Sequence, residues 1–476
     1  METLQRTANR GSISTATYEI GNSINFESGN TESLTKSQTA SNRKTWTLSW
    51  WFKRTKIDTD LQYLFHANVS SGNEFYLVIN GTSDFRIDDY ASGAQIRFHS
   101  GGSGESFRDP AAWYHVVIAC DTTQSTEANR FKVYINGVDV TAISGYFSTA
   151  QYPSEDYETH INDSSSTLSI GKSISASTNF CGYICEFNFI DGLMKEASDF
   201  GETNSNGIWI PKEYTGSYGN EGYFLNFADG GDLGDDESGN GKDFTENNIT
   251  AADQATDTCT NNFCTLNSLV NFKYGTNSSG MTDGATVFGD DTGGGIGGAF
   301  GTFGVTAGKW YWEVKLTQQV AHYIGVSAVD DGDNVLVTSD PQDVNSTFNF
   351  NISAARIEYH ENGSKVNGST DAFSDFHTVG DIIGIALNMD DNQISIYGNG
   401  TLQVGVANTS IFDAANKMVV PFHGTINDEC QYNFGGYSVW TPSSVQNDEN
   451  GYGTFEYSPP SGYYALCTQN LALYGG

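Results

Sequence analysis

The residues best suited to metal chemistry are aspartates in a glycine-rich loop near the middle of the chain. The loop follows a short strand-like run, Tyr223 to Phe227, and contains Asp232, Asp235 and Asp236. Calcium prefers carboxylate and carbonyl oxygens, so these three aspartates are candidate calcium ligands. Their spacing does not match the EF-hand loop, and an acidic turn in solvent is the alternative interpretation. Apart from calcium, we expect no cofactor.

A second polar loop, at 330–334, contains Asp331, Asp333 and Asn334. It could also hold a calcium ion, with a solvated loop as the alternative. Tyrosines at the rim of a β-sandwich are suited to pack against a ligand, because one end of the ring is apolar and the other is polar. We therefore take Tyr323, Asp331, Asp333 and Asn334 as the candidate ligand-binding residues.

The run Glu186-Phe-Asn188-Phe-Ile-Asp191 has acidic or amide side chains at strand spacing. It resembles the Glu-x-Asp-x-x-Glu strand of glycoside hydrolases with the concanavalin A-like fold, in which two carboxylates divide the roles of nucleophile and acid. Here the middle acid is an amide and the last is Asp. His115 lies inside a strand-like run, where we expect a buried and satisfied histidine. We therefore predict that the protein is not an enzyme.

The charge of the chain argues against nucleic acid as a ligand. The formal net charge of the 476 residues is −34, whereas phosphate binding requires basic patches. Residues 1–56 hold eight basic and four acidic side chains, which leaves a net charge of −38 on the rest. Within the polar stretch at 1–18, Arg6 and Arg10 are suited to pair with carboxylates of a neighbouring subunit. We predict that this stretch is an attachment arm.

Other features of the composition exclude further classes. No apolar run is long enough to cross a membrane, so we predict no membrane insertion. The seven cysteines are too few, and odd in number, for a disulfide scaffold. Cys181 and Cys185 would lie about 13 Å apart on a regular strand, too far for a disulfide. We expect free and mostly buried thiols.

Alternation of apolar and polar residues dominates on both sides of the acidic loop. In the run Thr45–Arg54, for example, Trp46, Leu48, Trp50 and Phe52 share one face, as a sandwich strand requires. No long amphipathic helix is evident. We predict an all-β chain with two antiparallel β-sandwich (jelly-roll) domains in tandem. The predicted parts are the N-terminal arm at 1–18, a first sandwich at 19–200, a connector at 201–264, a second sandwich at 265–440 and an irregular C-terminal segment at 441–476.

Each half also resembles a known family. The first contains, in order, TLSWWFK at 47–53, WYHVVIACD at 113–121, FKVYINGV at 131–138, LSIGK at 168–172 and GYICEFNFIDGLM at 182–194. In this order they resemble the laminin G-like, concanavalin A-like jelly rolls, which implies two curved antiparallel sheets with rim loops that bind sugars or calcium in many relatives. The second contains GKWYWEV at 308–314, IGV at 324–326, VGDIIGIALNMDDNQISIYGNG at 379–400 and NFG at 433–435. It resembles the SPRY (B30.2-type) sandwich, which implies binding of a protein or peptide through loops at one end.

The whole arrangement resembles virion proteins of marine bacterial viruses. The resemblance rests on the two sandwiches in this order, the start RTANRGSIST at 6–15 and the end PSGYYAL at 460–466. It implies a structural protein of the virion surface, in a tail fibre or appendage, that recognises a host-surface glycan or protein through sandwich-rim loops. Its partners would be the host ligand and other virion proteins, and assembly into a homo-oligomer stays open. A purely structural capsid or tail decoration protein is the main alternative, and a glycan hydrolase is less favoured.

Overall fold

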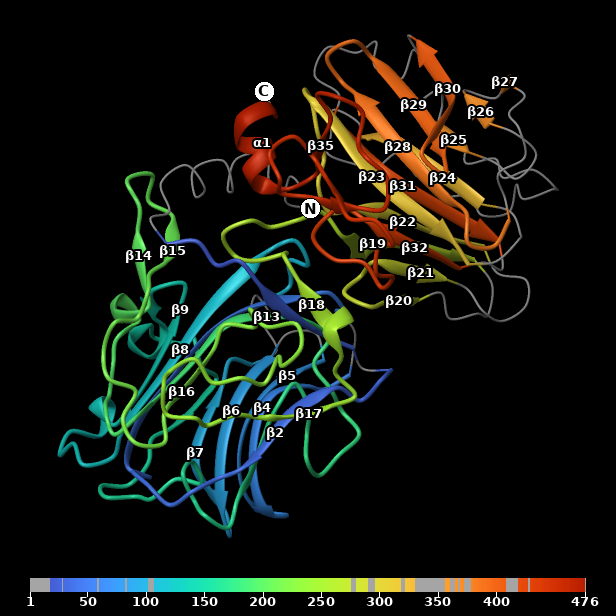
Figure 1. Ribbon diagram of the computed structural model, residues 1–476. Coiled ribbons are helices and arrows are strands. Elements are labelled where there is room, and N and C mark those ends of the chain that lie inside the picture. Colours follow the sequence, from blue (N-terminus) through green and yellow to red (C-terminus); the bar gives the residue numbers. More distant parts are fainter. Residues whose placement is uncertain are drawn as a thin grey trace. The chain divides into compact units, whose positions relative to one another are not determined.

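The computed structural model divides the chain into two compact units, and each is described by itself (Figure 1). The first contains Thr15–Asn261, and the second contains the chain from Asn262 onward. The structure describes residues 18–27, 29–57, 60–81, 84–101, 107–274, 280–289, 296–317, 322–329, 356–359, 364–366, 369–371, 378–407, 418–426 and 429–475. Strands dominate both units, so the predicted all-β fold of two sandwiches in tandem is confirmed.

One sheet of the first unit is built around β3, the strand predicted at Thr45–Arg54. Its path is β10-β9-β8-β3-β13-β1-β18, and β16 also pairs with β13. The strands are β1 (Ser23–Phe26), β3 (Thr45–Arg54), β8 (Trp113–Asp121), β9 (Phe131–Ile135), β10 (Val138–Asp139), β13 (Gly182–Asp191), β16 (Tyr223–Leu225) and β18 (Gln254–Ala255).

The other sheet of the first unit has the order β11-β7-β6-β5-β4-β12-β2-β17. Its strands are β2 (Ser33–Ser37), β4 (Gln62–Ser70), β5 (Asn73–Asn80), β6 (Asp84–Ala91), β7 (Ala94–His99), β11 (Thr149–Gln151), β12 (Thr167–Ile170) and β17 (Thr245–Asn247). Alternation sends every second side chain into the space between the two sheets. Trp46 of β3 meets Phe75 of β5 there, edge to face, with ring centroids 5.4 Å apart.

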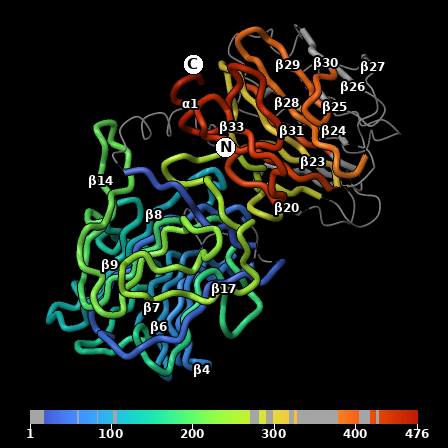
Figure 2. The backbone as a smooth tube through the Cα atoms, in the orientation of Figure 1, coloured from blue at the N-terminus to red at the C-terminus, as the bar shows by residue number. Residues whose placement is uncertain are grey.

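The predicted connector adds strands to both of these sheets. β16 pairs with β13, β17 with β2, and β18 with β1. Lys36 of β2 packs over the rings of Tyr223 and Phe244, 5.0 and 5.2 Å from their centroids. The connector therefore packs on the first sandwich as part of the same unit (Figure 2).

The second unit also consists of two main sheets. Their orders are β19-β22-β31-β24-β25-β26-β27 and β20-β21-β32-β23-β28-β29-β30. The first contains β19 (Leu266–Tyr274), β22 (Ile296–Gly301), β24 (His322–Val329), β25 (Arg356–Tyr359), β26 (Ser364–Val366), β27 (Ser369–Asp371) and β31 (Met418–Ile426). The second contains β20 (Gly280–Thr282), β21 (Val287–Gly289), β23 (Lys309–Leu316), β28 (Ile382–Asn388), β29 (Gln393–Gly398), β30 (Thr401–Ala407) and β32 (Glu429–Asn433).

The C-terminal segment, which we predicted to be irregular, packs on β23 of the second unit. β35 (Tyr464–Ala465) pairs with β23 in parallel, β33 (Gln446–Asn447) pairs with β34 (Thr454–Phe455), and α1 (Thr468–Tyr474) follows. Glu313 of β23 is buried and accepts the backbone N–H groups of Glu456 and Tyr457 at 2.9 and 2.8 Å. This carboxylate, together with the pairing of β35 on β23, fastens the C-terminal segment to the sheet.

The remaining elements are short. β14 (Gly201–Thr203) pairs with β15 (Trp209–Pro211), and single 3₁₀ turns lie at Glu127–Asn129, Val140–Ala142, Ala197–Asp199 and Ala251–Asp253. In the part of the chain that the structure describes, no helix is long and apolar enough to cross a membrane.

Candidate functional site

The acidic loop of the connector serves the fold. Asp236 is buried and accepts the N–H groups of Phe224, Ser238 and Lys242 at 2.8–2.9 Å. Asp232 accepts the N–H of Gly234 within its own turn. Burial and the charges of its acidic neighbours raise the pKa of Asp235. Among the described residues, no group of three or more His, Cys, Asp or Glu side chains is arranged to hold a metal ion.

The predicted ligand-binding and attachment residues lie almost entirely outside the described ranges. This applies to Asp331, Asp333 and Asn334, and to Arg6 and Arg10. The backbone of Tyr323 lies in β24, where it pairs with Gly424 of β31. These assignments therefore stay predictions.

The strand that resembles a hydrolase motif has hydrogen-bond partners within the chain. Glu186 stands at a β-bulge with a φ of +54° and accepts a hydrogen bond from the hydroxyl of Tyr18 at 2.7 Å. Burial raises the pKa of Glu186 to about 7. Asn188 accepts from the hydroxyl of Tyr218, and Asp191 accepts from Ser41 Oγ, Asn162 Nδ2 and the N–H of Glu221. All three side chains of the motif thus take part in holding the fold.

His115 is buried and satisfied, as its place in a strand predicts. Trp209 Nε1, which can only donate, lies 2.9 Å from His115 Nδ1. Nδ1 therefore accepts, and Nε2 carries the proton toward Ser49 Oγ, 2.9 Å away. Burial lowers the pKa of His115 to about 3. In this arrangement the histidine is a donor to Ser49 and not a base.

No sequence motif indicated a surface of the first unit on which several side chains suited to ligand recognition lie together. It is the side of the β7-β6-β5-β4 sheet that faces away from the core, and we call it the polar face. Along β5, Phe75, Leu77 and Ile79 are fully buried on the inner side, so Tyr76 projects to the other. Cross-strand register aligns His66, Tyr76, Asp88 and Arg97 in one row across the four strands. The polar face comprises Tyr63, His66, Asn68, Glu74, Tyr76, Asp84, Arg86, Asp88, Tyr90, Arg97 and His99.

Asp88 organises the centre of the polar face. Its carboxylate is buried and accepts from Arg97 Nε at 2.9 Å and from His99 Nε2 at 2.8 Å. Burial, the charge of Asp88 and a hydrogen bond to Asp88 raise the pKa of Tyr76. One buried anion therefore orients three partly exposed side chains from the two neighbouring strands, β5 and β7.

Aromatic rings lie on both sides of this centre. The ring of Tyr76 is 5.7 Å from that of Tyr63 and 6.1 Å from that of Tyr90, measured between centroids. The guanidinium of Arg97 lies 5.2 Å from the centroid of Tyr90 and also donates to its hydroxyl. The three tyrosines are partly exposed. Together they provide apolar surface beside fixed hydrogen-bonding groups.

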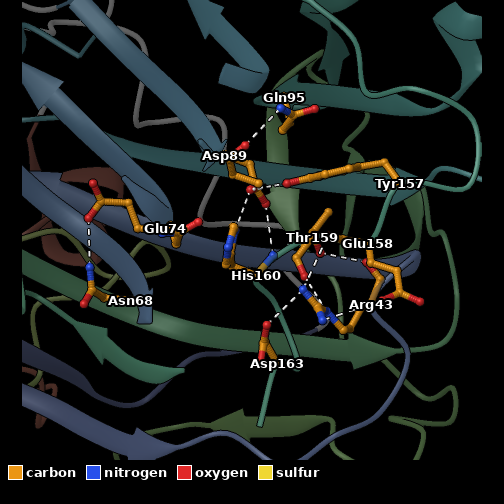
Figure 3. A network of polar contacts seen from close by, with 12 residues as sticks. Arg43, Asn68, Glu74, Asp89, Gln95, Tyr157, Glu158, Thr159, His160 and Asp163 are labelled. Atoms are coloured by element: carbon orange, nitrogen blue, oxygen red, sulfur yellow. Dashed lines mark hydrogen bonds and ion pairs between the residues drawn. The ribbon is translucent and has the colours of Figure 1, made fainter. Parts of the chain in front are cut away.

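Glu74 is the second carboxylate that positions side chains on the polar face. It accepts from His66 Nε2 at 3.0 Å and from Asn68 Nδ2 at 2.9 Å, the latter visible in Figure 3. The hydrogen bond from His66 lowers the pKa of Glu74 and burial raises it; the lowering is larger, so the pKa lies below its ordinary value. Because the carboxylate is ionised at neutral pH, it can fix both neighbours in place.

Asp89, the residue after Asp88, points to the opposite side. It accepts from His160 Nδ1 at 2.7 Å, from the N–H of His160 at 3.1 Å and from the hydroxyl of Tyr157 at 2.8 Å (Figure 3). All these groups belong to the interior of the sandwich or to the loop that closes it. Asp89 is thus structural and is not part of the polar face.

Family comparisons place both units in known classes. Residues 27–198 match the model of the concanavalin A-like lectin/glucanases superfamily, and residues 309–437 match the SPRY domain. The chain therefore carries these two domains in tandem, and the polar face lies within the first. Such domains indicate a ligand-binding module. Nothing in the matches indicates a viral or tail-fibre origin.

Solved structures show distant similarity to single parts of the chain. One is the SPRY domain of human HERC1, with 20% identity, a TM-score of 0.23, and coverage of 31% of this chain and 87% of that one. Another is a heptameric SAP-like pentraxin from Limulus polyphemus, with 15% identity, a TM-score of 0.27, and coverage of 38% and 80%. A third is domain 4 of AbnA, a GH43 extracellular arabinanase from Geobacillus stearothermophilus in complex with arabinotriose, with 16% identity, a TM-score of 0.24, and coverage of 33% and 64%. No curated protein matches the chain.

Proposed function

We propose that the protein binds a carbohydrate on the polar face of the first sandwich and does not cleave it. The observation that supports this proposal best is the row His66, Tyr76, Asp88 and Arg97, with its tyrosine rings on either side. Sugars present apolar C–H surfaces and hydroxyl edges. Tyrosine rings pack against the apolar surfaces, and fixed carboxylate, amide and guanidinium groups form hydrogen bonds with the hydroxyls.

The charges of the polar face favour a neutral or weakly charged glycan over a polyanion. Arg97 is paired with Asp88, and Arg86 with Asp84 at 2.6 Å. Both arginines therefore already have an anionic partner. Because the same pairs restrict side-chain motion before the ligand arrives, less entropy is lost on binding.

The expectation of binding without turnover is supported by the motif strand. Glu186 is bonded to Tyr18, the amide Asn188 replaces the middle acid, and Asp191 already accepts three hydrogen bonds. A retaining or inverting glycosidase requires two carboxylates that flank the bond to be cleaved. Reducing ends released from a host polysaccharide, and lost in Glu186→Gln, would instead assign an enzyme.

The biological setting proposed for this activity is the virion surface, where the protein would recognise a host glycan and contact other virion proteins. This part rests on the resemblance of the whole arrangement to virion appendage proteins. Attachment through Arg6 and Arg10 belongs to the same proposal. A purely structural decoration protein is the second candidate, and it would leave the polar face without a ligand.

Glycan arrays followed by calorimetry test the carbohydrate proposal. Tyr90→Ala and Arg97→Ala should each weaken binding of the selected glycan about tenfold or more, as expected for central contacts. Tyr134→Ala is the matched control, because Tyr134 is also a partly exposed tyrosine of the first unit but lies on β9 of the other sheet. If the folded Tyr90 and Arg97 variants bind as tightly as the unmodified protein, the polar face is not the binding site.

A further inference from the structure

Two cysteines that are distant in the sequence lie side by side in the first unit. Cys185 of β13 and Cys259, 74 residues later in the connector, have their Sγ atoms 3.9 Å apart. Both are free thiols; Cys185 is buried and Cys259 is partly exposed. A disulfide brings its sulfur atoms to about 2.05 Å, so closure needs a movement of about 2 Å.

The backbone around each cysteine is held by buried contacts. Cys185 pairs with Trp51 in the β3–β13 ladder. On either side of Cys259, the hydroxyls of Thr258 and Thr260 donate to the carbonyl of Ile20 at 2.9 and 3.0 Å. The fold therefore keeps the two side chains together, and rotation of the side chains alone can supply the remaining movement.

A buried ion pair fixes the approach to Cys259 more firmly. Asp257, two residues earlier, lies 2.8 Å from Lys53 Nζ, and both side chains are almost fully buried. Trp113 Nε1 donates to the other oxygen of the same carboxylate at 3.1 Å. Removing this segment from the sheet would leave buried charges without partners, which is costly. The two thiols therefore stay next to each other as long as the first unit is folded.

We propose that Cys185 and Cys259 form a redox-controlled disulfide that fastens the end of the connector to the central strand β13. The oxidant is a low-molecular-weight disulfide such as oxidised glutathione. The Cys259 thiolate attacks one sulfur of the oxidant, whose S–S bond breaks and releases one small thiol after protonation. The Cys185 thiolate then attacks Cys259 Sγ and releases the second small thiol. Two protein thiols lose two protons and two electrons, and the small disulfide gains them.

The surroundings of the pair determine its behaviour. Cys185 packs with Ile20 and Trp51, and Tyr18, Trp113, Trp209 and Cys259 pack against this cluster. Burial, followed by the neighbouring Cys185 and the charge of Glu186, raises the pKa of the Cys259 thiol. Thiolate is therefore scarce at neutral pH, and closure should accelerate as the pH rises.

The experiment uses the full chain, reduced and then incubated in the folded state with oxidised glutathione at pH 8. After free thiols are alkylated, non-reducing peptide mapping should show one cross-link between Cys185 and Cys259 and no retained glutathione. The melting temperature of the first unit should rise by about 5–10 °C, because the bond closes a long loop in the unfolded chain. Cys185→Ala should instead retain glutathione on Cys259.

Two further variants keep the result interpretable. In Cys259→Ala, Cys185 should stay a free thiol and react with the alkylating reagent. This variant tests the proposal even if Cys185→Ala does not fold. Cys120→Ala is the control, because Cys120 is a buried thiol elsewhere in the same unit and should not affect the cross-link. The proposal is overturned if the folded chain keeps both thiols free, stops at a mixed disulfide on Cys259, or cross-links mainly through other cysteines.

Discussion

Replacing Asp88 with asparagine tests whether the polar face depends on one buried anion. The substitution conserves size but removes the charge that holds Arg97, His99 and Tyr76. Each side chain that must be ordered again on binding costs ~0.5–1.5 kcal/mol, so three would cost ~1.5–4.5 kcal/mol. The glycan Kd should therefore rise about tenfold to a thousandfold.

The cost to stability should be smaller. The side chains of Arg97 and His99 are 30% and 20% exposed, so they can turn to water when the carboxylate is lost. We expect a loss of about 1–2 kcal/mol from the free energy of unfolding. Isothermal titration calorimetry gives the Kd, and differential scanning calorimetry gives the stability.

Asp89→Asn is the matched control for this experiment. Asp89 is the next residue, is equally buried and accepts three hydrogen bonds, but its partners His160 and Tyr157 lie on the core side. It should destabilise the first unit without changing the Kd of the folded protein. Asp88 does not organise a binding site if Asp88→Asn binds the glycan within twofold of the unmodified protein, or if both variants lose affinity equally.

Two carboxylates away from the polar face yield further predictions. Glu313→Gln should lower the free energy of unfolding of the second unit by about 2–5 kcal/mol, because the single oxygen of an amide cannot accept the N–H groups of both Glu456 and Tyr457. Calorimetry should show this loss. The same substitution at the exposed Glu449 should leave the unfolding transition unchanged. Glu186→Gln should remove a pH dependence of the stability of the first unit. Burial raises the pKa of Glu186 from 4.5 to about 7 in the folded state, so between these pH values the folded state binds a proton that the unfolded state does not. The free energy of unfolding therefore falls by ~2–3 kcal/mol as the pH rises through this range. Denaturant titrations at pH 5 and 7.5, with pulsed hydrogen exchange reporting on β13, should show this fall only in the unmodified protein; an equal fall in Glu186→Gln would assign it to other groups.

The strands were predictable because their signal is local. In Thr45–Arg54, four large apolar side chains alternate with residues that, apart from Trp51, are small or polar, and only an extended chain places the four on one side. The C-terminal segment carries no such period. Its structure depends on Glu313, about 140 residues earlier, and on pairing with β23. No pattern within the segment itself could reveal either contact.

The functional assignments depended on contacts that local patterns do not specify. Carboxylates that bind metal and carboxylates that bind backbone N–H groups look alike in a sequence. Asp236 accepts backbone N–H groups, and the calcium assignment of the acidic loop stays a prediction. Cys185 was compared with Cys181, its neighbour in the chain, whereas its spatial neighbour is Cys259. Strand pairing across long stretches of chain decides such contacts.

Asp88 and Asp89 show how much depends on the period of a strand. They are identical residues next to each other, both fully buried and both bonded to a histidine. Since successive side chains of a strand point to opposite sides, one holds the polar face and the other holds the interior. The sequence DFRIDDYA contains this distinction, because Phe85 and Ile87 mark the inner side and Asp89 continues it. What it cannot contain is the register that places Tyr76 and Arg97 opposite Asp88, and that register is what turns a polar strand into a surface suited to a ligand.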